Sequence, residues 1–359
     1  MQRRGASSSP PNRFERLRTV PPGAPGSFDL GLEPDPDEPP FDPRTIFLRD
    51  SSRTIVATNT SPDVGFDASV NPYRGCLHGC SYCYARPNHE YLGYSAGLDF
   101  ETKILVKTRA PQLLRRRLSL LSWKPQVVAF SGVTDAYQPA ERRFRITRGC
   151  LQVLAEFHNP AAIVTKGALI VRDTDVLGEL AEWGGASVVI SVTTLDEDLQ
   201  RRMEPLAARP LRRLAAIEAL AAAGVPVGVN VAPVVPGLTD HEIPGIVAAA
   251  AEAGARFAGM LVLRLPYGVK EIFSEWLEAH VPERKERVLA RLREMRGGKL
   301  YDGRFAVRGR GEGVYAEQLR AVFDLAARRS GLAGRGPTLE TRHFRVPHTG
   351  EQLGLFPET

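Results

Sequence analysis

The chain has 359 residues, of which 43% are hydrophobic and 25% are charged. This composition is typical of a globular protein and excludes a purely disordered or fibrous chain. No apolar run approaches the roughly 18 residues of a membrane span, and no apolar signal region follows Met1–Arg4. We therefore expect a cytoplasmic protein without a membrane partner. The formal net charge of +6 permits an anionic partner but does not require one.

Composition also divides the chain into segments. Residues 1–45 are rich in proline and carry a basic stretch followed by an acidic one, so they cannot bury a core. We predict a disordered leader there, a main domain over 46–296, and a Gly-rich segment with a helix over 297–330 that packs on this domain. The non-periodic residues 331–359 predict a flexible tail.

Short β-branched runs alternate with helical stretches through the main domain. This alternation predicts βα units and a parallel sheet. About six units are too few for a closed eight-stranded barrel, which leaves a partial barrel or a doubly wound sheet. No GxGxxG follows the first strand, which disfavours the dinucleotide-binding version of the latter. The predicted strands are 68–70, 127–130, 162–164, 188–192, 225–229 and 260–263, and the predicted helices are 141–157, 173–183, 210–223, 240–253, 282–296 and 314–330.

Three of the four cysteines, Cys76, Cys80 and Cys83, fall within eight positions. Their spacing lets three thiolates converge on one inorganic centre from a short loop, in which glycines supply backbone freedom. A structural zinc site needs four protein ligands, and His78 or His89 is a candidate for the fourth. A 4Fe-4S cluster held by three cysteines instead leaves one iron open. Cys150 is interpreted as a small buried hydrophobic residue.

This CxxxCxxC motif, with an aromatic residue before its last cysteine and a position after the first strand of a βα repeat, resembles that of the radical S-adenosylmethionine (SAM) superfamily. The resemblance implies a partial (β/α)6 barrel with a 4Fe-4S cluster on Cys76, Cys80 and Cys83. It also implies that SAM binds the open iron and is reductively cleaved to a 5′-deoxyadenosyl radical. An external electron donor of the flavodoxin or ferredoxin kind follows from the same chemistry.

Polar residues at the predicted strand ends agree with such a barrel, in which functional groups gather at the carboxyl ends of strands. By resemblance to the family, Tyr82 packs near the adenine, residues after the second strand serve the SAM amino group, and fourth-strand polar groups serve the ribose. A nearby basic residue serves the carboxylate. The second strand lacks the usual Gly-Gly-Glu form. Strand propensity, helix capping or solvated charge offers an alternative for each residue alone. The predicted cofactor-binding residues are Tyr82, Gly132, Thr134, Asp135, Lys166, Ser191, Thr193, Arg202 and Asn230.

Within the superfamily, residues 61–315 resemble the branch related to spore photoproduct lyase. The shared features include Asn71-Pro-Tyr-Arg-Gly before the first cysteine, and Val-Thr-Lys ending at Lys166. In that branch a cysteine after the second strand donates the hydrogen atom, and the matching position here is Gly132. The lyase reaction therefore does not transfer unchanged, and the catalytic hydrogen donor is unknown. The weak candidates are Tyr91, Tyr94, Tyr137 and Cys150.

The leading functional hypothesis is a radical SAM enzyme acting on nucleic acid, in DNA repair or base modification. The lyase resemblance, the net charge and basic runs such as 115–117 favour it, although arginines on a helix are also typical of a solvated face. One alternative is the same enzyme type acting on a peptide or small metabolite. Another is a zinc-stabilised binding module.

The C-terminal sequence Gln352-Leu353-Gly-Leu355-Phe356 resembles the short motif with which bacterial repair proteins dock on the sliding clamp. Its apolar side chains would enter a groove while Gln352 bonds at the edge, a mode suited to a terminal peptide. A five-residue match also arises by chance, and the alternative is an apolar C-terminal segment that folds back on the domain.

Overall fold

The computed structural model describes residues 4–10, 12–13, 44–130, 132–332, 334 and 336–347, and these form an α/β fold. A seven-stranded sheet has the order β10-β9-β8-β7-β6-β3-β2, in which all neighbours are parallel except β2 and β3. A doubly wound sheet reverses its strand order at a switch point, whereas these six parallel strands follow one another in sequence. The partial barrel predicted from the sequence is thus confirmed. The strands are β2 (Val56–Thr58), β3 (Ala68–Val70), β6 (Val128–Phe130), β7 (Ala161–Thr165), β8 (Ala186–Val192), β9 (Val227–Val234) and β10 (Phe257–Val262).

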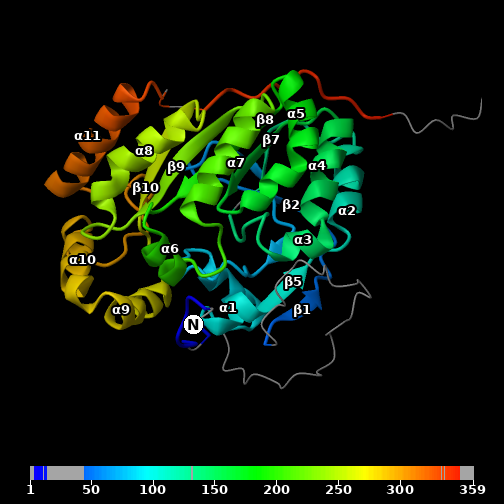
Figure 1. The fold of residues 1–359 in the computed structure, drawn as a ribbon. Coiled ribbons are helices and arrows are strands. Elements are labelled where there is room, and N and C mark those ends of the chain that lie inside the picture. Colours follow the sequence, from blue (N-terminus) through cyan, green and yellow to red (C-terminus); the bar gives the residue numbers. More distant parts are fainter. Residues whose placement is uncertain are drawn as a thin grey trace, which may run out of the picture.

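Helices cover the outside of this curved sheet (Figure 1). Val188, Ile190 and Val192 on β8 are almost completely buried, as expected for parallel strands. Two predicted helices are shorter than expected. Arg145 adopts a left-handed φ of 51°, which ends α3 before α4 begins, and a 3-10 turn (Asp240–Glu242) precedes α8. The outer helices are α3 (Ala140–Phe144), α4 (Ile146–Glu156), α5 (Thr174–Glu182), α7 (Pro210–Ala222), α8 (Ile243–Glu252) and α11 (Val314–Arg329).

A second layer of structure lies at the carboxyl ends of the parallel strands (Figure 1). It contains a three-stranded sheet of order β1-β5-β4, which the sequence analysis did not predict. Among the described residues, no helix is both long and apolar enough to cross a lipid bilayer. The remaining elements are β1 (Ile46–Arg49), β4 (Tyr73–Arg74), β5 (Lys103–Val106), 3-10 helices at Arg86–Leu92 and Ala168–Asp173, and helices α1 (Leu98–Thr102), α2 (Ala110–Leu118), α6 (Glu197–Met203), α9 (Val269–His280) and α10 (Pro282–Glu294).

The Gly-rich segment after α10 connects the two edges of the open sheet. The amide of Val262 on β10 donates to the carbonyl of Gly309 at 2.8 Å. On the other side, Arg308 forms an ion pair with Asp63 in the loop between β2 and β3. These contacts place the segment across the open side of the partial barrel.

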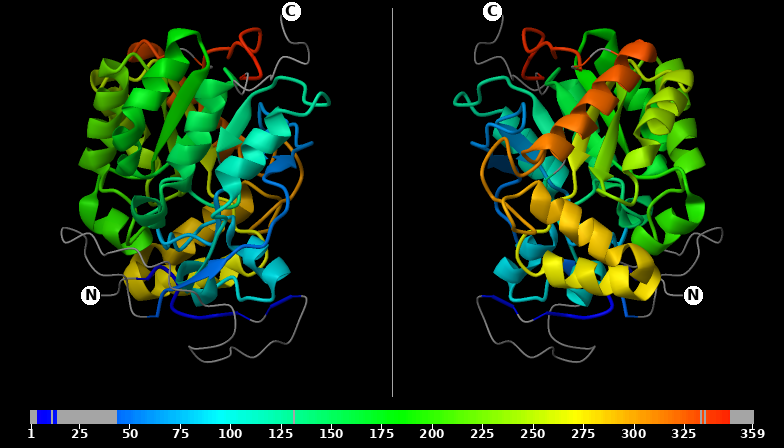
Figure 2. Two further views of the ribbon diagram at one scale, coloured as in Figure 1. Left: turned by 90° about the vertical axis from the view of Figure 1, so that its right-hand side faces the viewer. Right: turned by 90° about the vertical axis from the view of Figure 1, so that its left-hand side faces the viewer.

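The described parts of the predicted leader and tail both contact the domain. Residues 4–10 lie beside α9 at the same end of the molecule, as the two views of Figure 2 show, and the hydroxyl of Ser8 donates to Glu275 of α9 at 2.6 Å. In the tail, the amide of Arg345 donates to the carbonyl of Phe157 at 2.9 Å. The predicted leader of residues 1–45 therefore includes a short stretch with specific contacts. The candidate clamp motif of Gln352, Leu353, Leu355 and Phe356 lies outside the described residues.

Candidate active site

The three clustered cysteines lie in one loop between β4 and the 3-10 helix at Arg86–Leu92, and none forms a disulfide. Gly75 and Gly79 turn this loop with φ angles of +79° and +65°. A Cβ at Gly75 would lie 3.0 Å from the carbonyl oxygens of Phe100 and Lys103. Glycine is therefore required there for both backbone conformation and space.

Burial and, to a lesser extent, the neighbouring Cys76 raise the pKa of the Cys83 thiol to about 11. The pKa of Cys80 is also raised well above its usual value, first by burial and then by the carboxylate of Glu204. The thiols of Cys80 and Cys83 are therefore protonated at neutral pH in the apoprotein. Binding of iron as thiolate must release these protons, so loading of the site is favoured at higher pH.

The loop suits an inorganic group larger than one metal ion. Thiolates that share one zinc lie about 4 Å apart, because each Zn–S bond is about 2.3 Å long. Within the described residues, no three His, Cys, Asp or Glu side chains are close enough together to hold a single ion. The hydroxyl of Ser81 is buried and has no hydrogen-bond partner among those residues. Three unbridged thiols on one loop fit the three-cysteine ligand set of the predicted cluster, and His78, the nearest candidate for a fourth zinc ligand, is paired with Asp135.

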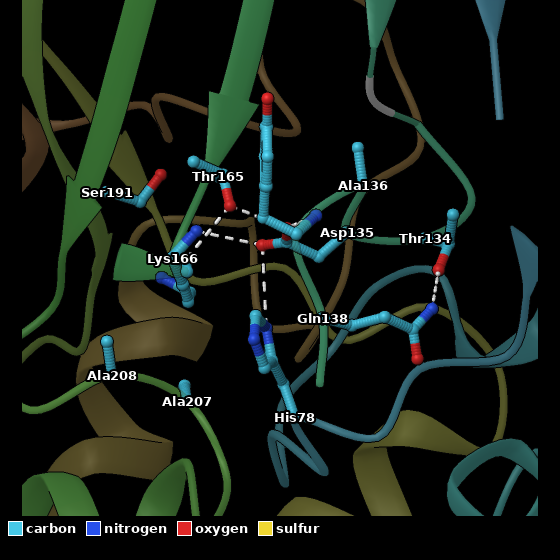
Figure 3. Close-up of polar contacts among 12 residues, drawn as sticks. His78, Thr134, Asp135, Ala136, Gln138, Thr165, Lys166, Ser191, Ala207 and Ala208 are labelled. Atoms are coloured by element: carbon cyan, nitrogen blue, oxygen red, sulfur yellow. Dashed lines mark hydrogen bonds and ion pairs between the residues drawn. The ribbon is translucent and has the colours of Figure 1, made fainter. Parts of the chain in front are cut away.

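Side chains after β6 hold the backbone of this loop. Thr134 donates to the carbonyl of Gly75 at 2.6 Å. Gln138 donates to the same carbonyl at 3.1 Å and accepts from the amide of Leu77 at 2.9 Å. Figure 3 also shows the bond between the Thr134 and Gln138 side chains. The predicted residue Thr134 is thus in contact with the loop, through its backbone.

Asp135 links the loop to the end of β7 (Figure 3). Its carboxylate accepts from the Thr165 hydroxyl at 2.5 Å and from the Lys166 amide at 2.8 Å, and it lies 3.4 Å from Nδ1 of His78. Burial alone would lower the pKa of His78, but Asp135 and Cys76 outweigh it and raise this pKa to about 10. Both oxygens of Asp135 are therefore engaged by the protein, and His78 is held as a cation.

A second polar group occupies the ends of β7, β8 and β9. The Lys166 ammonium donates to the Ala232 carbonyl at 2.7 Å and to the Thr193 hydroxyl at 3.1 Å, and it lies 3.4 Å from Glu204 Oε1. Glu204 also accepts hydrogen bonds from Tyr82 and Arg213.

Glu204 and Arg213 are both completely buried. Burial alone would raise the pKa of Glu204, but Arg213 and Lys166 outweigh it and hold this pKa far below its usual value. Two cations thus surround one carboxylate, and net positive charge is left beside the cysteine loop.

The structure brings together some predicted cofactor residues and separates others. Tyr82, Lys166 and Thr193 meet at Glu204, and the carbonyl of Ser191 accepts from Arg213 at 3.0 Å. Asn230 is half-buried on β9. Arg202 does not reach this group: it is exposed and donates to the His280 carbonyl at 2.9 Å. The arginine that does reach it is Arg213.

Gly132 and the candidate hydrogen donors are dispersed. Gly132 has a φ of +118°, and a Cβ there would meet nothing within 4 Å. Tyr91 is exposed, whereas the ring of Tyr94 lies against that of His89 at 5.3 Å between centroids, with the two planes tilted by 32°. Tyr137 is buried and donates to Asp173 at 3.1 Å. Cys150 is fully buried on the outer helix α4, as the sequence analysis expected.

Sequence reasoning missed the buried charges that hold the loop. Arg86 donates from Nε and Nη2 to the carbonyl of Cys80, at 3.0 and 2.7 Å, and pairs with Glu101. In the sequence, only the position of Arg86 three residues after Cys83 could have indicated that it holds the loop. Gln138 and Arg213 had none, since nothing in the sequence distinguishes a buried arginine or glutamine from a solvated one.

The sequence model of the Radical SAM superfamily matches residues 70–250, which include the cysteine loop and the parallel strands β6 to β9. The chain belongs to the radical SAM superfamily. It is an enzyme of this class, which uses a 4Fe-4S cluster and SAM and cleaves SAM reductively. Three thiols with no single-ion geometry agree with that cofactor.

Similar proteins occur in mycobacteria and archaea. Uncharacterized proteins of Mycobacterium tuberculosis and Mycobacterium bovis are each 36% identical over 273 residues, covering 76% of this chain and 79% of theirs. One from Methanocaldococcus jannaschii is 27% identical over 173 residues, or 48% of this chain and 62% of its own.

Solved structures of spore photoproduct lyase share the fold. The lyase complexed with dinucleoside spore photoproduct has a TM-score of 0.57 at 15% identity, covering 80% of each chain. A mutant with bound AdoMet and dinucleoside spore photoproduct has a TM-score of 0.55 at 16% identity, with the same coverage. This likeness confirms the relation to the lyase at the level of the fold.

Proposed function

We propose that Cys76, Cys80 and Cys83 bind the 4Fe-4S cluster and that the enzyme acts on DNA or another nucleic acid, as a lyase-like repair or base-modifying enzyme. The observation that carries the cluster assignment is the single buried loop that holds all three thiols beside net positive charge. When bound, the cluster supplies the electron that cleaves the SAM sulfonium to a 5′-deoxyadenosyl radical.

The chain's own residues bind and orient SAM in this proposal. Arg213 neutralises Glu204, so the Lys166 ammonium keeps positive charge for the SAM carboxylate. Tyr82 is held by Glu204 and Thr193, which orients its ring for packing against the adenine. Ser191 and Asn230, on the adjacent strands β8 and β9, are the polar groups for the ribose and the methionine part.

A nucleic-acid substrate is supported by two observations. The solved lyases with this fold include one that binds a dinucleoside photoproduct. Next to Cys83, the ring of Tyr84 is 43% exposed and lies 4.1 Å from the guanidinium of Arg264. An exposed aromatic ring beside an arginine is suited to stacking on a base and pairing with a phosphate.

The direct test is anaerobic incubation of the protein with SAM, a reductant and DNA carrying defined lesions. We expect 5′-deoxyadenosine from the wild type and the Cys150→Ala control, and none from Cys80→Ala. Full SAM cleavage by Cys80→Ala would exclude the cysteine assignment. Because Gly132 offers no thiol, spore photoproduct itself should not be repaired efficiently. DNA binding that does not weaken with salt would argue for a peptide or small-metabolite substrate instead.

Three further parts of the proposal concern the enzyme's surroundings. A flavodoxin- or ferredoxin-like protein would deliver the electron, and the cytoplasm is the proposed compartment because it keeps thiols reduced.

The terminal residues Gln352, Leu353, Leu355 and Phe356 would dock on the sliding clamp. Fluorescence anisotropy of a labelled peptide over 349–359 tests the docking, with a Leu355→Ala, Phe356→Ala peptide as control. No binding well above micromolar concentration would remove this partner.

A further inference from the structure

A short N-terminal segment, residues 4–10 and 12–13, lies across the outer side of the cysteine loop, and we call it the N-terminal strap. At one end it contacts Glu101 and Gly79, beside the cysteine loop. At the other end the guanidinium of Arg13 lies 3.6 Å from the ring centroid of Tyr267, in the loop between β10 and α9. The strap therefore joins the cysteine-loop region to the opposite flank of the barrel mouth.

The strap is held by a buried carboxylate. Glu101 is completely inaccessible to solvent, and it accepts hydrogen bonds from the backbone amides of Gly5 at 3.1 Å and Ala6 at 2.9 Å. The guanidinium of Arg4 donates to the Glu101 carbonyl at 2.7 Å. A buried carboxylate needs such donors, because the free energy lost by leaving water must be recovered from hydrogen bonds and opposite charge.

The same carboxylate connects the strap to a cysteine of the loop. Glu101 pairs with Arg86, which is also completely buried. The other N–H groups of Arg86 donate to backbone carbonyls: two donate to the carbonyl of Cys80, and one each to those of Ala96 and Gly97. A continuous chain of contacts therefore runs from the strap through Glu101 and Arg86 to the backbone of Cys80.

Close backbone contacts show that the strap fits one specific place. A Cβ on Gly5 would lie 1.6 Å from the carbonyl oxygen of Gly79, and a Cβ on Gly97 would lie 2.1 Å from that of Ser8. Neither distance is possible for a real side chain, so each contact requires glycine. An alanine at position 5 would prevent the strap from docking without changing any charge.

We propose that the N-terminal strap, Glu101 and Arg86 are positioning elements for Cys80, and that the docked strap seals the outer face of the cluster site against water and dioxygen. This inference rests on the proposed assignment of the cluster to Cys76, Cys80 and Cys83. Arg86 holds the Cys80 carbonyl, Glu101 orients Arg86, and the strap supplies the last donors that Glu101 needs. The strap thereby makes the retention of the cluster depend on the first residues of the chain.

The test compares full-length wild type with Gly5→Ala, and uses Ser7→Ala as the matched control. Ser7→Ala removes one exposed hydroxyl that bonds Glu275 and leaves the backbone contacts of the strap intact. After anaerobic reconstitution, all three should contain the same iron and sulfide. On exposure to air, the visible cluster absorbance of Gly5→Ala should decay about tenfold faster, a factor equivalent to about 1.4 kcal/mol of lost docking free energy.

A second readout separates positioning from general stability. Hydrogen exchange of the amides from Cys80 to Arg86 should be faster in anaerobic Gly5→Ala, while exchange in β8 and β9 stays unchanged. Equal decay rates in wild type and Gly5→Ala, or equal acceleration in Ser7→Ala, would overturn the inference. Failure of the proposed function looks different, because the wild type itself would then bind no 4Fe-4S cluster.

Discussion

Two completely buried arginine–glutamate pairs hold the cysteine loop from opposite sides, and they differ in what completes them. Arg86–Glu101 holds the carbonyl of Cys80 from outside, and Arg213–Glu204 holds the hydroxyl of Tyr82 from within the barrel. The outer carboxylate takes its other donors from the backbone of the N-terminal strap. The inner carboxylate takes them from side chains at the ends of β7 and β8.

From this difference we infer which side of the site is rigid and which side can open. The inner pair is completed by strands of the main sheet, which cannot move without loss of the barrel core. The outer pair is completed by a short terminal segment, whose departure costs only local contacts. Removing one partner of a buried ion pair is most costly where the protein cannot relax and admit water.

The largest expected effect is therefore at the inner pair. Glu204→Ala would leave Arg213 and Lys166 as uncompensated positive charge in the barrel interior. We expect the free energy of unfolding of the apoprotein to fall by about 3–5 kcal/mol. Chemical denaturation measures this loss, with Glu278→Ala, an exposed glutamate on α9, as the control. A loss below about 1 kcal/mol would show that the inner pair is not a rigid element.

At the outer pair, replacing the glutamate by alanine should lower the free energy of unfolding by a smaller amount. Glu101→Ala also leaves a buried arginine, but the strap can lift and let water reach Arg86. A loss of about 1–3 kcal/mol is expected, as for one unsatisfied group that water can partly reach. Equal losses for Glu101→Ala and Glu204→Ala, measured in the same denaturant series, would contradict the contrast between the two sides.

The fold was largely predictable because parallel strands repeat a strong signal. Runs such as 188–192 are rich in β-branched residues and alternate with long helical stretches, so β8 and the parallel sheet followed from the pattern. The choice of a partial barrel over a doubly wound sheet came from the family resemblance. The break at Arg145 was not predicted, because local propensity does not reveal a residue in the left-handed conformation. The small sheet of β1, β4 and β5 was missed because its strands are two to four residues long.

The site was predictable only where chemistry dictates spacing. The cysteine motif can be recognised from its spacing alone. The rule that functional groups gather at the carboxyl ends of parallel strands pointed to Lys166 and Thr193, which do meet at the inner pair. The supporting charges lie outside any motif. Arg213 comes from α7 and Glu101 from α1, and their burial depends on tertiary packing that no local pattern encodes. The same holds for the strap, whose proline-rich surroundings suggested no structure.

A third effect depends on pH and arises on the inner side, where His78 lies beside Asp135. The pKa of His78 is about 10 in the folded protein against 6.5 for the free side chain. Its contribution to stability is therefore fully present below pH 6.5 and is lost as the pH rises from 6.5 to about 10.

The measurement is the apoprotein unfolding free energy of wild type and His78→Gln across this range. The difference should be largest below pH 6.5, where His78 is charged in both the folded and the unfolded protein, and should shrink steadily as the pH rises toward 10. A difference that does not depend on pH would show that His78 acts by packing rather than by charge.

The smallest effect should come from removing the hydroxyl through which the inner pair reaches the loop. Tyr82→Phe keeps the ring and its edge contact with Phe273, at 6.4 Å between ring centroids, and removes the hydroxyl that bonds Glu204 and Thr193. Because Glu204 keeps Arg213, Thr193 and Lys166, the loss should be about 0.5–1.5 kcal/mol. In a Glu204→Ala background the cost of Tyr82→Phe should become smaller, because the hydroxyl then keeps only its contact with Thr193. An unchanged cost in that background would show that Tyr82 is held by Thr193 rather than by the inner pair.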